Sequence, residues 1–255
     1  FEDGNVVHVE GSIDPARDVE TIEIELAMAD IATVEKRLDG VRGKMKAGKT
    51  KDLELEEAAL AKWFAVLEQG KMANTVELTD DERAVVRDVN LLTNKPILYV
   101  LNVAEGQTPT PLLLKEGLGV VTSEQLPISI KLESEIMEMA PEDQKLFLAE
   151  LGLNQSGLDR LIAKCYELLN LITFLTTGEK ETRAWTITRG TKAPQAAGII
   201  HTDFEKGFIR AEVISYADFV AHGGEAGARG NGKLRVEGKE YVMRDGDVSH
   251  FRVST

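Results

Sequence analysis

The sequence predicts an α/β protein that carries a helical hairpin and ends in a β-grasp unit. Two amphipathic stretches with heptad-like apolar spacing predict the hairpin over residues 17–78. Short apolar runs that alternate with helical patterns predict an α/β region within residues 79–170, and turn signals predict a loop over 1–16. Several β-branched and aromatic runs, with one short helical stretch among them, predict the β-grasp unit over 171–255.

The composition is that of a globular protein. The chain has 255 residues, of which 43% are apolar, and this length allows two or three compact units. No apolar run approaches the roughly 18 residues that a membrane span needs. The single cysteine, Cys165, cannot form an internal disulfide, which fits a reducing compartment. We therefore expect a cytoplasmic protein without a membrane partner.

Charge is distributed unevenly along the chain. The formal net charge is −13, but residues 171–255 hold 12 Lys and Arg against 11 Asp and Glu, a net of +1 that leaves −14 for the remainder. A near-neutral C-terminal unit can approach RNA where the acidic part cannot. Its candidate phosphate contacts are basic residues of the predicted sheet, with a solvated sheet face as the alternative interpretation. They are Lys192, Lys206, Arg210 and Arg235, with Arg183 and Arg189 as further candidates.

The predicted hairpin has an apolar seam on each arm. The helical pattern starts at Asp18, the turn spans 47–50, and Gly70 is a helix stop. Two interpretations remain for this arm, a solvated coiled coil or a surface that docks a partner. The seam residues are Ile24, Met28, Ile31, Leu38 and Met45 in the first arm, and Leu53, Leu60, Trp63 and Leu67 in the second.

The α/β region continues after the hairpin. Thr79 and Glu82 have the spacing of a capping box and predict a helix over 79–92. Cys165 lies on the apolar face of the last predicted helix, which indicates a core residue and not a reactive thiol. The other predicted elements are strands 96–101 and 126–130 and helices 131–139, 141–150 and 157–169.

The C-terminal region is rich in strand-forming residues. Trp185 and Phe208 are predicted core residues, and His201 and Asp203 are predicted to organise a turn. Asp245 and Gly246 provide a further turn signal. The predicted strands are 172–177, 182–188, 207–215 and those within 233–253, with a short helix over 194–200.

A candidate base-reading segment follows the strand 96–101. Guanine readers of the type Asn-Lys-x-Asp use the Asp to accept from guanine N1 and N2. Here Asn102, Val103, Ala104 and Glu105 replace that tetrad, so the Lys is missing and the acid is longer. The Asn102 carboxamide can instead serve the N6 donor and N7 acceptor of adenine, with help from the Val103 backbone. The alternative is a strand-ending Asn that caps a turn.

Longer runs carry a family resemblance. The runs TRAWTITRGTKAPQAAGIIHTDFEKGFIRAEVISYADF, FEDGNVVHVEGSIDPARDVETIEIELAMAD and KEYVMRDGDVSHF are similar to the YchF family, the Obg-like ATPases. The resemblance covers nearly the whole chain. It implies a Ras-like P-loop nucleotide domain that includes residues 1–16 and 79–170, an antiparallel coiled-coil hairpin over 17–78 inserted into it, and a C-terminal TGS domain of β-grasp fold over 171–255.

The resemblance also implies a function and a set of site residues. The family implies a monomeric ATPase that can also bind GTP, associates with the ribosome, through its large subunit, and acts in translation or stress responses. Asn102 and Glu105 match its base-specificity tetrad, and Ser129 and Ile130 are expected to edge the base pocket. His8 matches a family His that faces the nucleotide and can orient or activate the attacking water. The alternative for His8 is a loop residue ordered by packing.

One family motif is absent from this sequence. Residues 43–50 spell a Walker A loop, but a charged helical pattern precedes them where a strand is required, so we interpret the match as accidental. The chain is therefore expected to begin partway through its nucleotide domain, with the ligands of Mg²⁺ upstream. On this interpretation the chain alone does not hydrolyse ATP.

Two functions therefore remain in competition. The first is an ATP-dependent molecular switch whose state reaches the ribosome through the hairpin and the TGS domain. The alternative is a non-enzymatic interaction module that binds RNA or the ribosome.

Overall fold

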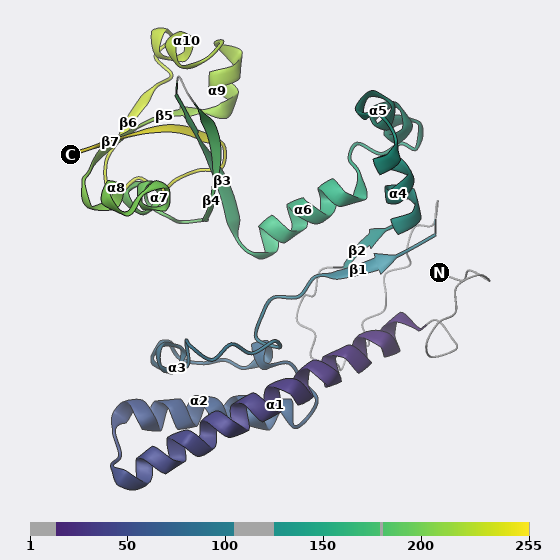
Figure 1. Ribbon diagram of the computed structural model, residues 1–255, viewed down its shortest axis with the longest axis vertical. Helices are drawn as coiled ribbons and strands as arrows, with labels where there is room; N and C mark the ends of the chain where they lie inside the picture. The colour runs from purple at the N-terminus through teal and green to yellow at the C-terminus, as the bar shows by residue number, and fades with distance from the viewer. Residues whose placement is uncertain (1–13, 105–124, 179–180, 255) are drawn as a thin grey trace. The chain divides into compact units, whose positions relative to one another are not determined.

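A computed structural model of the chain describes residues 14–104, 125–178 and 181–254 (Figure 1). The chain divides into two compact units, residues 1–161 and 162–255. The division into three domains drawn from the sequence stays a prediction.

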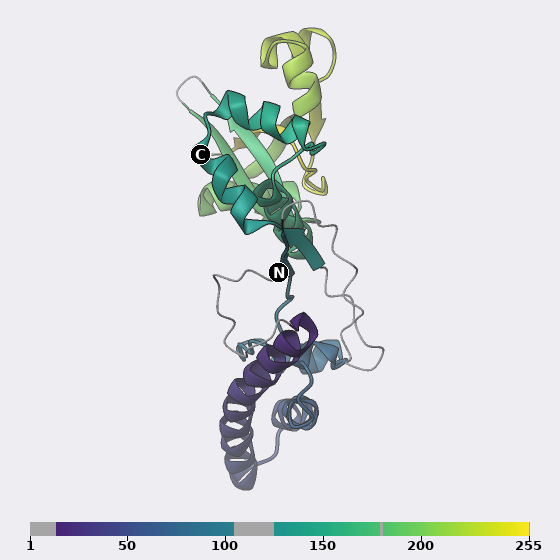
Figure 2. The same cartoon turned by 90° about the vertical axis from the view of Figure 1, so that its right-hand side faces the viewer.

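The first unit begins with the hairpin. Helix α1 (Pro15–Ala47) starts three residues before the predicted Asp18, because the Asp14 side chain accepts from the Arg17 backbone and Pro15 occupies the first turn. Helix α2 (Lys51–Leu67) starts after Thr50, whose hydroxyl accepts from the Leu53 backbone. With 17 residues against 33, α2 is too short to cover α1 and lies beside its C-terminal half (Figures 1 and 2).

The accidental Walker A spelling lies in this hairpin. Gly43 is inside α1, and Thr50 caps α2. The Gly48 backbone donates to the Lys44 carbonyl at 3.2 Å as the helix ends. No strand precedes this segment within the part of the chain that the structure describes, which agrees with our interpretation.

The predicted seam of α1 is wrong in its N-terminal half. Ile24 and Met28 are 42% and 65% exposed. Glu23 and Asp30 are buried in their place, and both have partners outside the hairpin, so an apolar pattern cannot find them. Farther along, the core of the hairpin joins α1 and α2 as expected. Its buried members include Val34, Val41, Leu60, Trp63 and Leu67.

The helix predicted over 79–92 is shorter in the structure. The capping box of Thr79 and Glu82 is confirmed, but α3 (Asp80–Val85) ends seven residues early. The chain then turns, because the Asp30 carboxylate accepts from the Leu92 and Thr93 backbones and holds them against α1. A short 3-10 helix, η1 (Ala73–Thr75), precedes α3.

A two-stranded parallel sheet follows. Strands β1 (Tyr99–Asn102) and β2 (Gln125–Ile128) replace the predicted ranges 96–101 and 126–130. Ser129 and Ile130 leave the strand and start α4 (Ile130–Glu138). Helices α5 (Pro141–Glu150) and α6 (Gly157–Leu168) agree closely with their predicted ranges.

The predicted core role of Cys165 is wrong. Cys165 is only half-buried, and Leu158, Ile162 and Leu169 on the same apolar face are 43%, 49% and 53% exposed. The amphipathic pattern forms the helix as predicted.

The second unit is a five-stranded mixed sheet in the order β4-β3-β7-β5-β6 (Figure 1). Strand β3 is parallel to β7, and the other neighbours are antiparallel. Phe174, Val213 and Phe251 form its core together with small residues of α7, where alanines allow the helix to approach the strands closely. The strands are β3 (Leu171–Thr177), β4 (Thr182–Thr188), β5 (Phe208–Ser215), β6 (Arg235–Glu237) and β7 (Asp247–Val253).

Helix α7 (Ala193–Ile200) agrees with the prediction, and three shorter helices were not predicted. These are α8 (Thr202–Lys206), α9 (Tyr216–Ala221) and α10 (Glu225–Gly230), each too short to show a helical period. His201 caps α8 by accepting from the Asp203 backbone at Nδ1, which confirms its role in a turn. Phe208 is buried as predicted, whereas Trp185 is half-buried beneath the Arg183 guanidinium.

Candidate functional site

The two parallel strands of the first unit end at a common edge. Asn102 is in register with Ile128, and the Val103 backbone donates to the Ile128 carbonyl at 3.0 Å. In parallel α/β sheets the carboxyl ends of the strands form the edge at which ligands bind. The predicted base-reading segment therefore lies where such a ligand is expected.

The Asn102 carboxamide is held in one orientation. Its Oδ1 accepts from the Ile130 backbone N–H at 3.2 Å. Because an N–H must face the oxygen and not the NH₂ group, this contact fixes which end of the amide is which. Among the described residues no acceptor meets Nδ2, so its hydrogens remain available to a ligand.

Ser129 and Ile130 complete this edge. The Ser129 hydroxyl caps α4 by accepting from the Leu132 backbone at 3.4 Å. The Ile130 side chain is 56% exposed and offers apolar surface beside the amide. The structure thus brings Asn102, Val103, Ser129 and Ile130 together through one strand end and one helix start.

A second group of contacts, missed in the sequence, supports the edge from behind. Glu133 of α4 accepts from the backbones of Gly157 at 2.6 Å and Leu158 at 3.0 Å. Arg160 donates to the Pro127 carbonyl of β2 at 3.1 Å. These contacts fasten the start of α6 to β2 and α4. They join residues more than twenty positions apart, so no local pattern reveals them.

Replacing Gly157 by Ala is expected to destabilise this region by about 2 kcal/mol through overpacking. An added Cβ would meet Glu133 Oε1 at 2.6 Å and Ile128 Cγ2 at 2.8 Å. Thermal unfolding followed by circular dichroism measures the change. Gly40→Ala is the matched control, because its Cβ would meet nothing within 4 Å and alanine favours the helix by about 1 kcal/mol. A Gly157→Ala protein as stable as the parent would contradict the close packing.

Two carboxylates of α1 hold the segment that leads into β1. Glu23 accepts from the Tyr99 hydroxyl at 2.5 Å. Burial and this carboxylate raise the pKa of Tyr99 above its ordinary value. Asp30, 2% exposed, accepts from the Thr93 backbone at 2.7 Å and the Thr93 hydroxyl at 2.6 Å. The only sequence signal is their seven-residue spacing, which places polar residues in an otherwise apolar helical seam.

Some predicted features cannot be placed. His8 and Glu105 lie outside the described residues. Among the residues that are described, no group of three or more His, Cys, Asp or Glu could hold a metal ion. In the same ranges, no helix has both the length and the apolarity required to cross a membrane.

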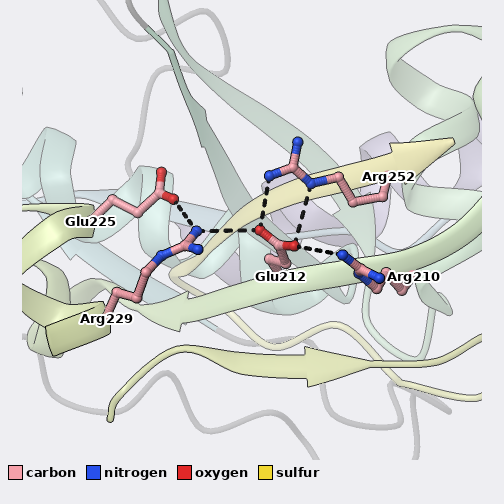
Figure 3. Close-up of polar contacts among 5 residues, drawn as sticks. All are labelled: Arg210, Glu212, Glu225, Arg229 and Arg252. Atoms are coloured by element: carbon pink, nitrogen blue, oxygen red, sulfur yellow. Dashed lines mark hydrogen bonds and ion pairs between the residues drawn. The ribbon is translucent and has the colours of Figure 1, made fainter. Parts of the chain in front are cut away.

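Three of the four main candidate RNA contacts are ion-paired. Lys192 Nζ lies 2.5 Å from Glu240, and Arg235 lies 3.3 Å from Asp247. Arg210 lies 3.3 Å from Glu212. Lys206 is exposed, and no ion pair involves it among the described residues. The sequence did not reveal that Arg229 and Arg252 converge with Arg210 on Glu212 (Figure 3).

Comparison with known proteins assigns the family. The family model described as "YchF-GTPase_C: Protein of unknown function (DUF933)" matches residues 171–254. The ribosome-binding ATPase YchF of Bacillus subtilis (strain 168) is 48% identical over 258 residues, which cover 99% of this chain and 70% of that protein. The chain belongs to the YchF family.

Other YchF proteins show the same extent of similarity. The ribosome-binding ATPase YchF of Escherichia coli O157:H7 is 46% identical over 98% of the chain and 70% of its own length. The solved structure of the Schizosaccharomyces pombe YchF GTPase matches with a TM-score of 0.82 at 35% identity, covering 99% of this chain and 70% of that one. The resemblance to YchF proteins expected from the sequence is confirmed, and so is the mixed α/β fold.

Proposed function

We propose that this chain serves an ATP-binding and ATP-hydrolysing molecular switch that associates with the ribosome and acts in translation or stress regulation. The orientation of Asn102, with its oxygen held and its NH₂ group available, is the observation that carries the proposal. The names of its relatives in Bacillus subtilis and Escherichia coli support ATP and the ribosome. A third relative is named a GTPase, so the base preference is the point to test.

The chemistry of the fixed amide favours adenine. The Asn102 NH₂ group can donate to N7, and the second lone pair of Oδ1 can accept from the N6 amino group. Guanine carries the oxygen O6 in place of the N6 amino group, so Oδ1 of Asn102 would face a second acceptor. In this proposal the Ile130 side chain packs on the ring, and Val103 and Ser129 line its edge.

Two further residues enter the proposal through the family alone. We assign Glu105 to the same base pocket and His8 to the attacking water. No group of three or more metal-ligating side chains lies among the described residues, and we assign those residues base recognition alone.

The contacts of α1 suggest how nucleotide binding would reach the hairpin. Tyr99 begins the strand that ends at Asn102, and it is tied to Glu23 of α1. Thr93 donates to Asp30, which lies two turns after Glu23 in the same helix. A base that shifts the tip of β1 would therefore act on α1 through two polar contacts, one buried and one partly buried. We assign 17–78 to the coiled-coil insertion and 171–255 to the TGS domain, in a cytoplasmic monomer.

Nucleotide-dependent ribosome binding tests this function in the full-length gene product. We expect calorimetry to show tighter binding of ATP than of GTP. We also expect the fraction that co-sediments with purified ribosomes to change when ATP replaces ADP. Co-sedimentation that ignores nucleotide would instead support a non-enzymatic interaction module.

A further inference from the structure

One buried carboxylate in the second unit gathers three arginines. Glu212 lies on β5, an inner strand of the sheet, and its side chain is 8% exposed. It accepts from Arg252 Nε at 3.3 Å and Nη2 at 3.1 Å, from Arg210 at 3.3 Å, and from Arg229 at 3.4 Å (Figure 3). The bond from Arg252 lowers the pKa of Glu212, which keeps the carboxylate ionised at neutral pH.

The arrangement places like charges side by side. Arg210 of β5 is directly opposite Arg252 of β7, and directly opposed like charges destabilise a sheet. Glu212 holds them together. Arg229 of α10 joins this group, and its guanidinium also lies 2.7 Å from the Glu225 carboxylate. Three cations therefore surround two carboxylates, which leaves an excess of positive charge. This group of Arg210, Arg229 and Arg252 around Glu212 is called the arginine cluster below.

The cluster keeps unused donors at the surface. The three arginine side chains are 51%, 53% and 44% exposed for Arg210, Arg229 and Arg252. Glu212 engages only some of the N–H groups that each guanidinium carries. A fixed guanidinium with free N–H groups matches the oxygens of a phosphate. The cluster is therefore organised to bind an anion before any ligand arrives.

The neighbours of Glu212 on the sheet indicate how a ligand would be read. In register with it are His250 on β7 and Val236 on β6, both exposed. Of these two, His250 has an aromatic ring on which an unpaired base can stack, and Val236 has none. Three arginines beside one such ring favour contact through the phosphate backbone over recognition of bases.

We propose that the arginine cluster binds backbone phosphates of RNA, and that Glu212 is a positioning residue that holds the three guanidinium groups in place. The inference rests on the proposed association with the ribosome, and it names the chemistry of one contact. An RNA ligand fits the charge distribution, since the second part of the chain is near neutral while the remainder is strongly acidic. Arg229 and Arg252 thereby join Arg210. Lys192 pairs with Glu240, and Arg235 lies between Glu237 and Asp247, so neither has the excess of positive charge that the cluster has.

The test uses the full-length gene product with the triple variant Arg210→Gln, Glu212→Gln and Arg252→Gln. This change removes the carboxylate together with two of its partners, so no unpaired buried charge remains, and the net charge falls by one. Arg244→Gln is the control, because it makes the same net change at an exposed residue outside the cluster. Melting temperatures confirm that both variants are folded.

Binding is measured by fluorescence anisotropy with a labelled short RNA duplex, and by co-sedimentation with purified ribosomes. The triple variant is expected to bind the duplex about tenfold more weakly than the parent, and the slope of log affinity against log salt concentration is expected to be smaller in magnitude by about 2. The affinity of the control is expected to stay within about twofold of the parent's. Arg229→Gln, which keeps the two-bond contact of Arg252, is expected to lower the slope by about 1.

The outcomes separate the two proposals. A triple variant that binds RNA and ribosomes as the control does would overturn the role of the cluster. Loss of ribosome binding with unchanged affinity for the duplex would overturn it too, because the ligand would then be an acidic protein. If the parent protein does not co-sediment with ribosomes, and the triple variant still binds RNA more weakly than the parent, the proposed function fails and the phosphate site stands.

Discussion

Asn102→Ala is expected to lower the affinity of the full-length gene product for ATP by about ten- to a hundredfold, the value of one bidentate contact to a base. The alanine removes both the NH₂ donors and the oxygen that the Ile130 backbone holds. Isothermal titration calorimetry with ATP measures the loss. The affinity for GTP should fall less, because the fixed amide is matched to adenine.

Two further variants make the result specific. Asn102→Asp keeps an acceptor for the Ile130 backbone but replaces the donors by a second acceptor and adds a negative charge, so it should weaken ATP binding at least as much. Asn154→Ala removes an exposed carboxamide from a turn and should leave ATP binding unchanged. An Asn102→Asp protein that binds ATP as well as the parent would show that the NH₂ group is not the reader.

Asp30→Ala is expected to lower the free energy of unfolding of the hairpin region by about 3 kcal/mol, because buried hydrogen-bond donors lose their acceptor. The donors are the backbones of Leu92 and Thr93 and the Thr93 hydroxyl, and Thr93 is fully buried. Urea unfolding can be followed by the fluorescence of Trp63, which lies in the hairpin core, in a Trp185→Phe background.

A matched aspartate controls for charge. Asp39 is exposed on the same helix, so Asp39→Ala should change stability by no more than about 0.5 kcal/mol. Asp30→Asn keeps one acceptor oxygen, so its loss of stability should lie between those of Asp30→Ala and Asp39→Ala. Equal effects of Asp30→Ala and Asp39→Ala would mean that the 91–93 segment does not depend on this carboxylate.

Local chemistry was enough to predict many elements. The capping box of Thr79 and Glu82, the strand over 182–188 and the helix over 141–150 depend on neighbours in sequence, and the structure has them at or near the predicted bounds. The turn at Gly246 has φ +76°, a backbone conformation that glycine adopts without strain.

Contacts between distant residues account for what the sequence could not predict. Glu23 and Asp30 are polar, so apolar periodicity assigned the seam of α1 to Ile24 and Met28 instead. Their burial depends on Tyr99 and Thr93, more than sixty residues later. The early end of α3 also depends on a distant residue, because Asp30 holds the backbones of Leu92 and Thr93.

In the candidate site, too, local sequence predicted the position of a residue, but distant contacts set its orientation. The sequence pointed to Asn102, because its position after an apolar run is visible locally. The orientation of its amide depends on Ile130, which comes near only when β1 and β2 pair in parallel. The arginine cluster depends on the register of β5 and β7 and on α10, none of which a linear pattern contains.

The most direct test of the account is a crystal structure of the full-length gene product with a non-hydrolysable ATP analogue. The account predicts that adenine lies at the common end of β1 and β2, with N7 about 3 Å from Asn102 Nδ2 and the ring against Ile130. A base held elsewhere, with the Asn102 amide facing only solvent, would contradict it.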